Sequence, residues 1–110
     1  PFNGGMTTCD ALWMGVPVIA LCGDRPVGRT GMSILSNIGL RELIAKNPGE
    51  YVELAVELAG DSGRLGHLRK NLRERMLCSR LMDAPRFAGD FSDLLQRAWE
   101  EKGECPPWQR

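Results

Sequence analysis

The chain has 110 residues, of which 43% are hydrophobic and 25% are charged, as in one small globular domain. Fourteen basic residues balance fourteen acidic ones, so the sequence lacks the basic excess that binders of nucleic acid or anionic membranes carry. The longest apolar run, Ala11 to Cys22, contains Gly15 and Pro17 and is shorter than the roughly twenty residues that a membrane-spanning helix needs. We therefore expect no nucleic-acid partner and no membrane partner.

The first predicted element is a short helix over Thr7 to Met14, closed by Gly15 and preceded by the glycine turn of N-G-G-M-T-T-C-D. The first N–H groups of a helix have no intrahelical acceptor and lie at the positive end of its dipole, so a phosphate can bind there. Gly4 and Gly5 allow a ligand to approach the backbone, and the carboxylate of Asp10 can accept a hydrogen bond from a sugar hydroxyl. The same residues are also the ordinary chemistry of a capped helix start, and both interpretations stay open at this point.

A buried parallel strand is expected over Val16 to Leu21, a fully apolar run rich in β-branched residues. Cys22 to Pro26 is then a loop at the carboxyl edge of that strand, where open α/β folds bind their ligands. A second helix is expected over Gly28 to Asn37, ended by Gly39, whereas Arg41 to Lys46 fits a strand or a helix equally well. This order of elements predicts an α/β fold.

Three longer helices complete the predicted order. One covers 47–59 and begins with the cap Asn47, and the next covers 61–79 and begins with the cap Asp61. The last covers 85–101, and we expect its apolar face to clasp the body of the domain through Phe87, Phe91, Leu94, Leu95 and Trp99.

The helix over 61–79 also carries a stripe of basic residues that we interpret as a solvated face rather than an RNA contact, because the whole chain is neutral: Arg64, Arg69, Lys70, Arg73 and Arg75. The organisation that we predict has three parts: an α/β segment over 1–46, helices over 47–102 that pack on the same lobe, and a flexible tail over 103–110.

The four cysteines lie far apart and never form C-x-x-C, and His67 is the only histidine. This distribution disfavours a zinc site or disulfides and favours free thiols in a reducing compartment, so we expect a cytoplasmic protein without a metal. The chain opens on Pro1 rather than on a methionine, and we expect it to be part of a longer polypeptide.

Three sequence segments, taken in chain order, indicate a family: N-G-G-M-T-T-C-D-A-L-W-M-G-V-P-V-I-A-L, then Gly28 to Gly31 with Ser33, then L-S-N-I-G-L-R-E-L-I-A. In this order they resemble the C-terminal end of the O-linked N-acetylglucosamine transferases, glycosyltransferase family 41, the SPINDLY-like branch included. The resemblance runs from Pro1 to about Trp99. It implies the C-terminal part of a GT-B, Rossmann-like lobe that holds the nucleotide sugar, in a protein whose catalytic region follows a tetratricopeptide superhelix.

The resemblance also implies the site residues. The family pattern G-[HG]-T-T-x-x-D places diphosphate contacts at Gly5, Met6 and Thr7 and a ribose contact at Asp10, with Thr8 as support. Two positions depart from it, because Gly5 stands where animal members have a histidine and Met6 stands where a threonine is usual.

Arg29 matches a family arginine that can face phosphate or acceptor, although a structural pairing with Asp24 or Glu42 is an equal alternative. No residue of this segment is expected to be catalytic, because the usual catalytic histidine and lysine of the family lie upstream of Pro1.

The implied activity is an inverting, metal-independent transfer of N-acetylglucosamine from UDP-GlcNAc to serine or threonine of a protein acceptor, with the UDP-sugar as co-substrate and no cofactor. Two alternatives stay open: a lobe that uses GDP-fucose, and a non-catalytic helical interaction module. One edge of the strand over Val16 to Leu21 should be bare without upstream strands, so we also expect that the isolated chain can self-associate there.

Overall fold

The computed structural model describes residues 2–103. Five α-helices and two short strands follow one another, joined in part by 3-10 turns: α1 (Met6–Trp13), β1 (Ala20–Leu21), η1 (Pro26–Gly28), α2 (Thr30–Asn37), η2 (Arg41–Leu43), β2 (Ile44–Ala45), α3 (Pro48–Gly60), α4 (Ser62–Leu77), η3 (Arg80–Met82) and α5 (Ala84–Gly103). Of the predicted tail over 103–110, Gly103 is the last residue of α5, and residues 104–110 lie outside the described part.

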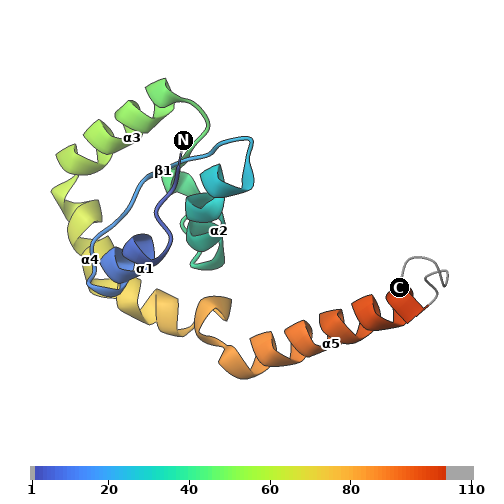
Figure 1. Ribbon diagram of the computed structural model, residues 1–110. Helices are drawn as coiled ribbons and strands as arrows, with labels where there is room; N and C mark the ends of the chain where they lie inside the picture. The colour runs from blue at the N-terminus through green and yellow to red at the C-terminus, as the bar shows by residue number, and fades with distance from the viewer. Residues whose placement is uncertain (1, 104–110) are drawn as a thin grey trace.

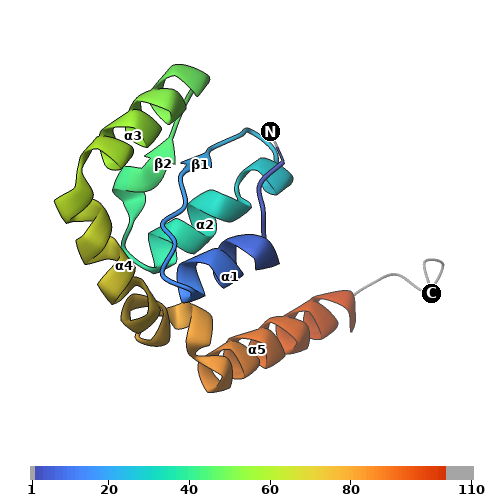
Figure 2. The same cartoon turned by 90° about the vertical axis from the view of Figure 1, so that its left-hand side faces the viewer.

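The two strands form a parallel pair in which Ala20 is opposite Ile44 and Leu21 is opposite Ala45. Helix α3 lies on one side of this pair, and α2 with α1 lies on the other (Figures 1 and 2). The predicted strand over Val16 to Leu21 is thus only two residues long, because β2 offers only two partners. The segment Arg41 to Lys46, which fitted both a helix and a strand, contains both in succession.

The ends of the helices follow local sequence chemistry. Gly15 and Gly39 have φ of 80° and 72°, left-handed values that favour glycine, and they end α1 and α2 as predicted. The predicted caps are also confirmed, since Oδ1 of Asn47 accepts from the N–H of Glu50 and Oδ1 of Asp61 accepts from the N–H of Arg64.

One hydrophobic core joins the sheet to the four helices around it. Its fully buried side chains come from α1, α2, the following loop, η2 and α4: Leu12, Leu35, Leu40, Leu43 and Leu72. Because this core includes residues on both sides of position 46, the segments 2–46 and 47–77 pack as one body. The predicted division at residue 46 stays a prediction.

Helix α5 stands apart from this body (Figure 1). The prediction that its apolar face clasps the body is wrong for the described chain, since all the side chains described in α5 are exposed. The radius of gyration is 18.4 Å, against about 13 Å for a compact chain of this length, and the longest dimension is 63 Å. The helix prediction itself is correct, but periodicity does not say which surface an apolar face contacts.

The turn η3 connects α4 to α5. Ser79 fixes this turn, because its hydroxyl donates to the carbonyl oxygen of Met76 over 2.6 Å and its Oγ accepts from the N–H of Leu81 over 3.2 Å. The direction of α5 is therefore set by a few residues between two helices.

Candidate functional site

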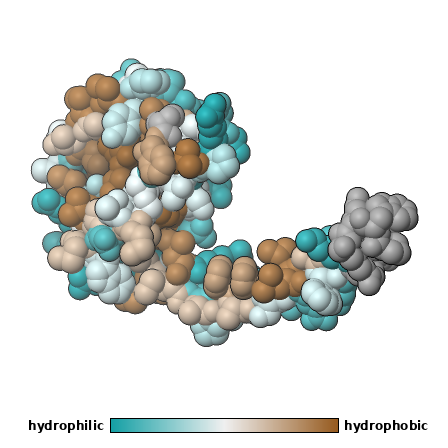
Figure 3. Space-filling view, in the orientation of Figure 1, coloured by the Kyte–Doolittle hydropathy of each residue, from teal (hydrophilic) through white to brown (hydrophobic). Residues whose placement is uncertain are grey.

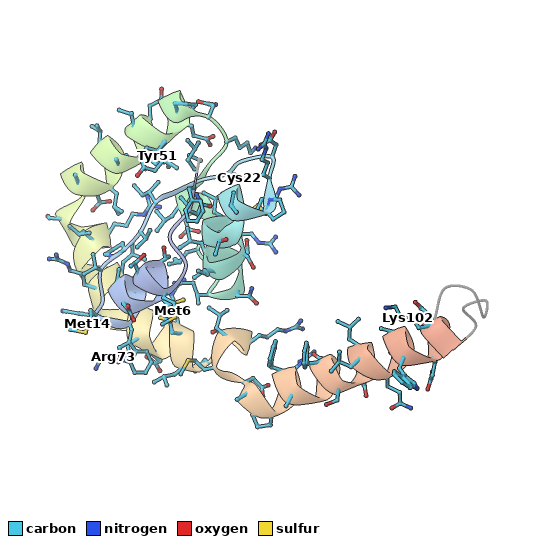
Figure 4. The ribbon with its side chains drawn as sticks, in the orientation of Figure 1. Met6, Met14, Cys22, Tyr51, Arg73 and Lys102 are labelled. Carbon is cyan, nitrogen blue, oxygen red and sulfur yellow. The ribbon has the colours of Figure 1, made fainter. Side chains whose placement is uncertain are left out.

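The start of α1 has main-chain donors and no side-chain cap. Gly5 is the N-cap residue, with φ of −104° and ψ of −87°, and no side chain accepts a hydrogen bond from this helix start. Met6 is 80% exposed and lies on the outside of the body, and Thr7 is also exposed (Figure 4). The first N–H groups of α1 thus have no side-chain partner, and they lie at the positive end of an eight-residue helix.

The two threonines have different surroundings. Thr8 is buried, and its hydroxyl donates to the carbonyl oxygen of Gly4 over 3.0 Å. A Cβ at Gly4 would lie only 2.7 Å from Oγ1 of Thr7 and 2.8 Å from Oγ1 of Thr8, so the turn requires glycine here. Thr8 therefore holds the turn in shape, whereas Thr7 remains on the solvent side.

Asn3 is a structural link that sequence reasoning missed. Its Nδ2 donates to the carbonyl oxygen of Leu21, its Oδ1 accepts from the N–H of Gly31, and its own N–H donates to the carbonyl oxygen of Val27. Gly31 is needed for this close approach, because a Cβ there would lie 2.7 Å from Cβ of Ala20. Asn3 thereby ties the turn before α1 to the end of β1 and to the start of α2.

The start of α2 lies beside the start of α1. A Cβ at Gly5 would be 3.8 Å from Cγ2 of Thr30, the first residue of α2. Arg29 is the N-cap residue of α2 and is exposed, and its Nε donates to the carbonyl oxygen of Gly23 over 3.2 Å. Within residues 2–103 it forms no ion pair with Asp24 or Glu42, so the alternative of a structural pairing with either carboxylate is not realised.

Thr30 was not among the predicted site residues. Its signal was the same as that of Thr7, namely a threonine just after a glycine-containing turn that opens a helix. The structure thus brings Gly5, Thr7 and Thr30 to two neighbouring helix starts.

The opposite ends of α1 and α2 lie against the basic side of α4. Nε of Arg73 donates to the carbonyl oxygen of Trp13, the last residue of α1, and the guanidinium lies 5.1 Å from the centre of the Trp13 ring. Nη1 of Arg75 donates to the carbonyl oxygen of Gly39, just after α2. Figure 4 shows Arg73 beside Met14 at this end of the body. Cations thus lie at the negative ends of both helix dipoles, and both positive ends are left on the side of Gly5.

A groove of about 300 Å³ runs along the outer edge of β1. Gly4 and Thr8 contribute to one wall, and Tyr51, which Figure 4 shows on the side of α3 that faces the sheet, contributes to another. Its full lining is Phe2, Asn3, Gly4, Thr8, Val18, Ile19, Ala20, Leu21, Gly31 and Tyr51. Of the predicted ligand residues, only Thr8 belongs to this lining, and Gly5, Met6, Thr7, Asp10 and Arg29 are outside it. Most of the predicted ligand residues therefore lie next to the groove rather than in it, and the groove itself follows a bare strand edge.

Further properties of the described part of the chain bear on function: its metal-binding groups, the surroundings of its histidine and the length and hydropathy of its helices. Between residues 2 and 103, no three side chains of His, Cys, Asp or Glu are grouped in a way that could hold a metal ion. Nε2 of His67 lies 3.1 Å from Nδ2 of Asn71, one turn further along α4. None of the helices that the structure describes is both long enough and apolar enough to cross a membrane.

Comparison with known proteins gives consistent matches. The model of "Glycosyl transferase family 41" matches residues 1–91. The protein named "Probable UDP-N-acetylglucosamine--peptide N-acetylglucosaminyltransferase SPINDLY" is 43% identical to this chain in Eustoma exaltatum subsp. russellianum and 39% identical in Arabidopsis thaliana, over 112 aligned residues that include the whole chain. The chain spans only 12% of the length of these two relatives.

The "UDP-N-acetylglucosamine--peptide N-acetylglucosaminyltransferase" of Caenorhabditis elegans is 34% identical over 98 residues, which cover 89% of this chain and 8% of that protein. Among solved structures, a mutant of the Thermobaculum terrenum O-GlcNAc transferase superposes with a TM-score of 0.83 at 37% identity, covering 92% of this chain and 19% of the solved one. This likeness confirms the predicted α/β fold.

Proposed function

The chain belongs to glycosyl transferase family 41, and from this membership we propose that it is the C-terminal part of a protein O-glycosyltransferase and holds the diphosphate and ribose of a nucleotide-sugar donor. The proposed donor is UDP-GlcNAc, and the proposed acceptor is serine or threonine of a protein. The rest of the activity belongs to the longer polypeptide, since this chain spans 12% of its plant relatives.

The observation that carries the proposal is the pair of adjacent helix starts. Gly5 precedes α1 without a side-chain cap, and Thr30 opens α2 at its side. A diphosphate bound there would receive hydrogen bonds from main-chain N–H groups and would lie at the positive ends of two helix dipoles. Arg73 and Arg75 lie at the other ends of these helices, so their positive charges do not attract the anion away from the helix starts.

The side chains around this start have separate proposed roles. Thr7 is exposed and can turn its hydroxyl to a phosphate oxygen, and Asp10, also exposed and one turn further, can accept from a ribose hydroxyl. Arg29 can face phosphate, because only its Nε is used by the carbonyl of Gly23. The contribution proposed for Met6 comes from its N–H alone.

A site of this kind supports a metal-independent reaction. When the sugar is transferred, negative charge develops on the leaving diphosphate, and preorganised N–H groups stabilise that charge without a cation. Within this segment the proposed task is therefore to bind and stabilise the leaving group. The proton transfer from the acceptor hydroxyl is assigned to the part of the catalytic region outside this chain.

Two other functions compete with this one. A GDP-fucose lobe would use the same phosphate contacts, because nothing in the described site reads the base or the sugar. A non-catalytic helical interaction module would have the same fold and would bind no nucleotide.

The decisive experiment is a chimera in which this chain replaces the matching segment of the Thermobaculum terrenum enzyme. UDP and GDP are titrated against it by calorimetry, with the unmodified enzyme as a positive control. Tighter binding of UDP would support the proposal, and a preference for GDP would support the fucose alternative. A chimera that melts cooperatively and binds neither nucleotide would support the interaction module and refute the donor site.

A further inference from the structure

A second concave surface lies where the end of α1 packs on α4. Its volume is about 220 Å³, and it is here called the basic pocket; its lining is Trp13, Met14, Gly15, Arg69, Lys70 and Arg73. Half of these residues are cations, and none is a carboxylate. Figure 4 shows Arg73 and Met14 side by side at this end of the body, and Figure 3, in the same orientation, shows hydrophilic and apolar surface adjoining there.

The shape of the basic pocket comes from the close packing of α1 on α4. A Cβ at Gly15 would lie 2.8 Å from the carbonyl oxygen of Arg69, so the chain can pass α4 at this distance only with glycine. Arg73 is anchored to the same turn, because its Nε donates to the carbonyl oxygen of Trp13 over 3.0 Å and its guanidinium lies 5.1 Å from the centre of the Trp13 ring. The guanidinium is therefore positioned before a ligand arrives, and the negative end of α1 is already bonded.

The cations of the basic pocket have no carboxylate partner in the described chain. The ion pairs formed within residues 2–103 lie elsewhere, one between α4 and α3 and the other on α5. Arg69, Lys70 and Arg73 are exposed, so their charges face solvent. Like charges gathered around a hollow raise the local positive potential, which attracts an anionic group more strongly than one isolated charge does.

We propose that the basic pocket binds an acidic segment of a partner protein. Side-chain carboxylates of the segment pair with Arg69, Lys70 and Arg73, and an apolar part of the segment lies against the ring of Trp13. A guanidinium suits this ligand, because its planar fork matches the two oxygens of a carboxylate. The pocket would thus recruit acidic proteins to the enzyme on a surface that the nucleotide does not use.

A polypeptide fits the basic pocket better than a nucleic acid or an anionic membrane does. Both of these are extended polyanions, and their binding depends on many basic contacts spread over a wide surface. This chain has no basic excess, since fourteen basic residues balance fourteen acidic ones. A hollow of about 220 Å³ has room for side chains rather than for a duplex, and the ring of Trp13 offers an apolar contact that a phosphate backbone does not use.

The basic pocket is separate from the candidate donor site. It lies at the end of α1, whereas Gly5 and Thr7 lie at its start, and a helix of eight residues is about 12 Å long. The proposal rests on charge and shape and not on nucleotide binding. A chimera that binds no nucleotide would therefore leave it standing.

The test measures, by fluorescence anisotropy, the binding of a fluorescein-labelled peptide to the chimera. The peptide is a run of glutamates with a central leucine, and the control peptide has glutamine in place of every glutamate. The double variant Arg69→Gln/Lys70→Gln removes charge from the pocket and leaves Arg73 in place. Its matched control, Arg41→Gln/Lys46→Gln, removes the same charge from exposed residues outside the pocket. The unmodified Thermobaculum enzyme reports any binding by the host.

The glutamate peptide should bind at least about 10-fold more tightly than the glutamine peptide. The pocket double variant should weaken this binding at least about fivefold, because it loses the charge contacts of two cations. The matched control should change it by at most about twofold, since salt screens distant charges. All replaced side chains are exposed, so the variants should melt alike. Lys70→Glu, which reverses a single charge, gives a second comparison if the double variant does not melt cooperatively.

Two results would overturn the proposal: a glutamate peptide that binds no better than the glutamine peptide, or equal losses of affinity in the pocket double variant and its matched control. Single-stranded RNA and phosphatidylserine vesicles are titrated in parallel. If either binds more tightly than the glutamate peptide, and only the pocket double variant weakens that binding, the pocket belongs to that polyanion and the proposal fails as well.

Discussion

Replacing Met6 with proline removes one main-chain donor from the start of α1 and leaves the helix in place. Met6 is the first helical residue, so its N–H has no intrahelical acceptor, and proline is favoured at this position. The residue before it is Gly5, which has no Cβ to collide with the proline ring. The substitution therefore tests whether the amide itself binds the diphosphate, which no ordinary side-chain replacement does.

The expected loss of UDP affinity in Met6→Pro is that of one hydrogen bond to a charged group. Such a bond contributes about 1.5–3 kcal/mol, which corresponds to about 10- to 150-fold in the Kd for UDP. Met6→Ala keeps the amide and removes an exposed side chain, so we expect its Kd to change by no more than about twofold. The contrast between the two variants carries the prediction.

Calorimetric titration of UDP against the chimera measures both values at one ionic strength, and thermal melting checks that each variant folds. Melting temperatures should agree closely, because position 6 is exposed and begins the helix. If Met6→Pro folds normally and binds UDP as tightly as Met6→Ala does, the N–H of this residue is not a phosphate ligand and the reasoning about the start of α1 fails.

Three further substitutions test the site and its support. Asp10→Ala should weaken UDP binding to the chimera by about 1–3 kcal/mol in calorimetry, while Asp93→Ala, on exposed α5, leaves it unchanged; equal affinities would remove Asp10 from the site. Asn3→Ala should lower the free energy of unfolding by about 1–3 kcal/mol in urea, because two main-chain groups lose their partner, and a smaller change would show that water replaces the amide. Gly15→Ala should lower the free energy of unfolding by about 1–3 kcal/mol, because Gly15 has a φ of 80° that alanine disfavours. The control Gly66→Ala, inside α4 with open space around it, should raise the free energy of unfolding by about 0.5–1 kcal/mol. A change of the same sign in both variants would contradict the backbone argument.

Sequence alone predicted the features that depend on near neighbours in the chain. The caps Asn47 and Asp61 act on N–H groups three residues away, and Gly15 and Gly39 adopt the backbone conformation that glycine favours, so each could be recognised from a short window. The α/β fold of GT-B type could be predicted because the helix and strand signals agreed with a family resemblance, and the likeness to a solved transferase confirms it.

The features that sequence missed depend on distant contacts. Asn3 binds the N–H of Gly31, 28 positions away, and no local pattern marks that pairing. The strand over Val16 to Leu21 is short because its length depends on what β2 offers rather than on its own residues. The donor residues Thr7 and Asp10 stay predictions, since they came from the resemblance and need a bound nucleotide to be tested.

Because α5 is long and projects from the turn η3, a small rotation at this turn displaces the far end of α5 by a large distance. A helix of 20 residues is about 30 Å long, so a rotation of only about 10° at its beginning moves its far end by roughly 5 Å. The hydroxyl of Ser79 links that pivot directly to the last turn of α4, a helix that also holds the ends of α1 and α2 through Arg73 and Arg75. The beginning of α5 is therefore bonded to the same helix that supports the two helices of the candidate site.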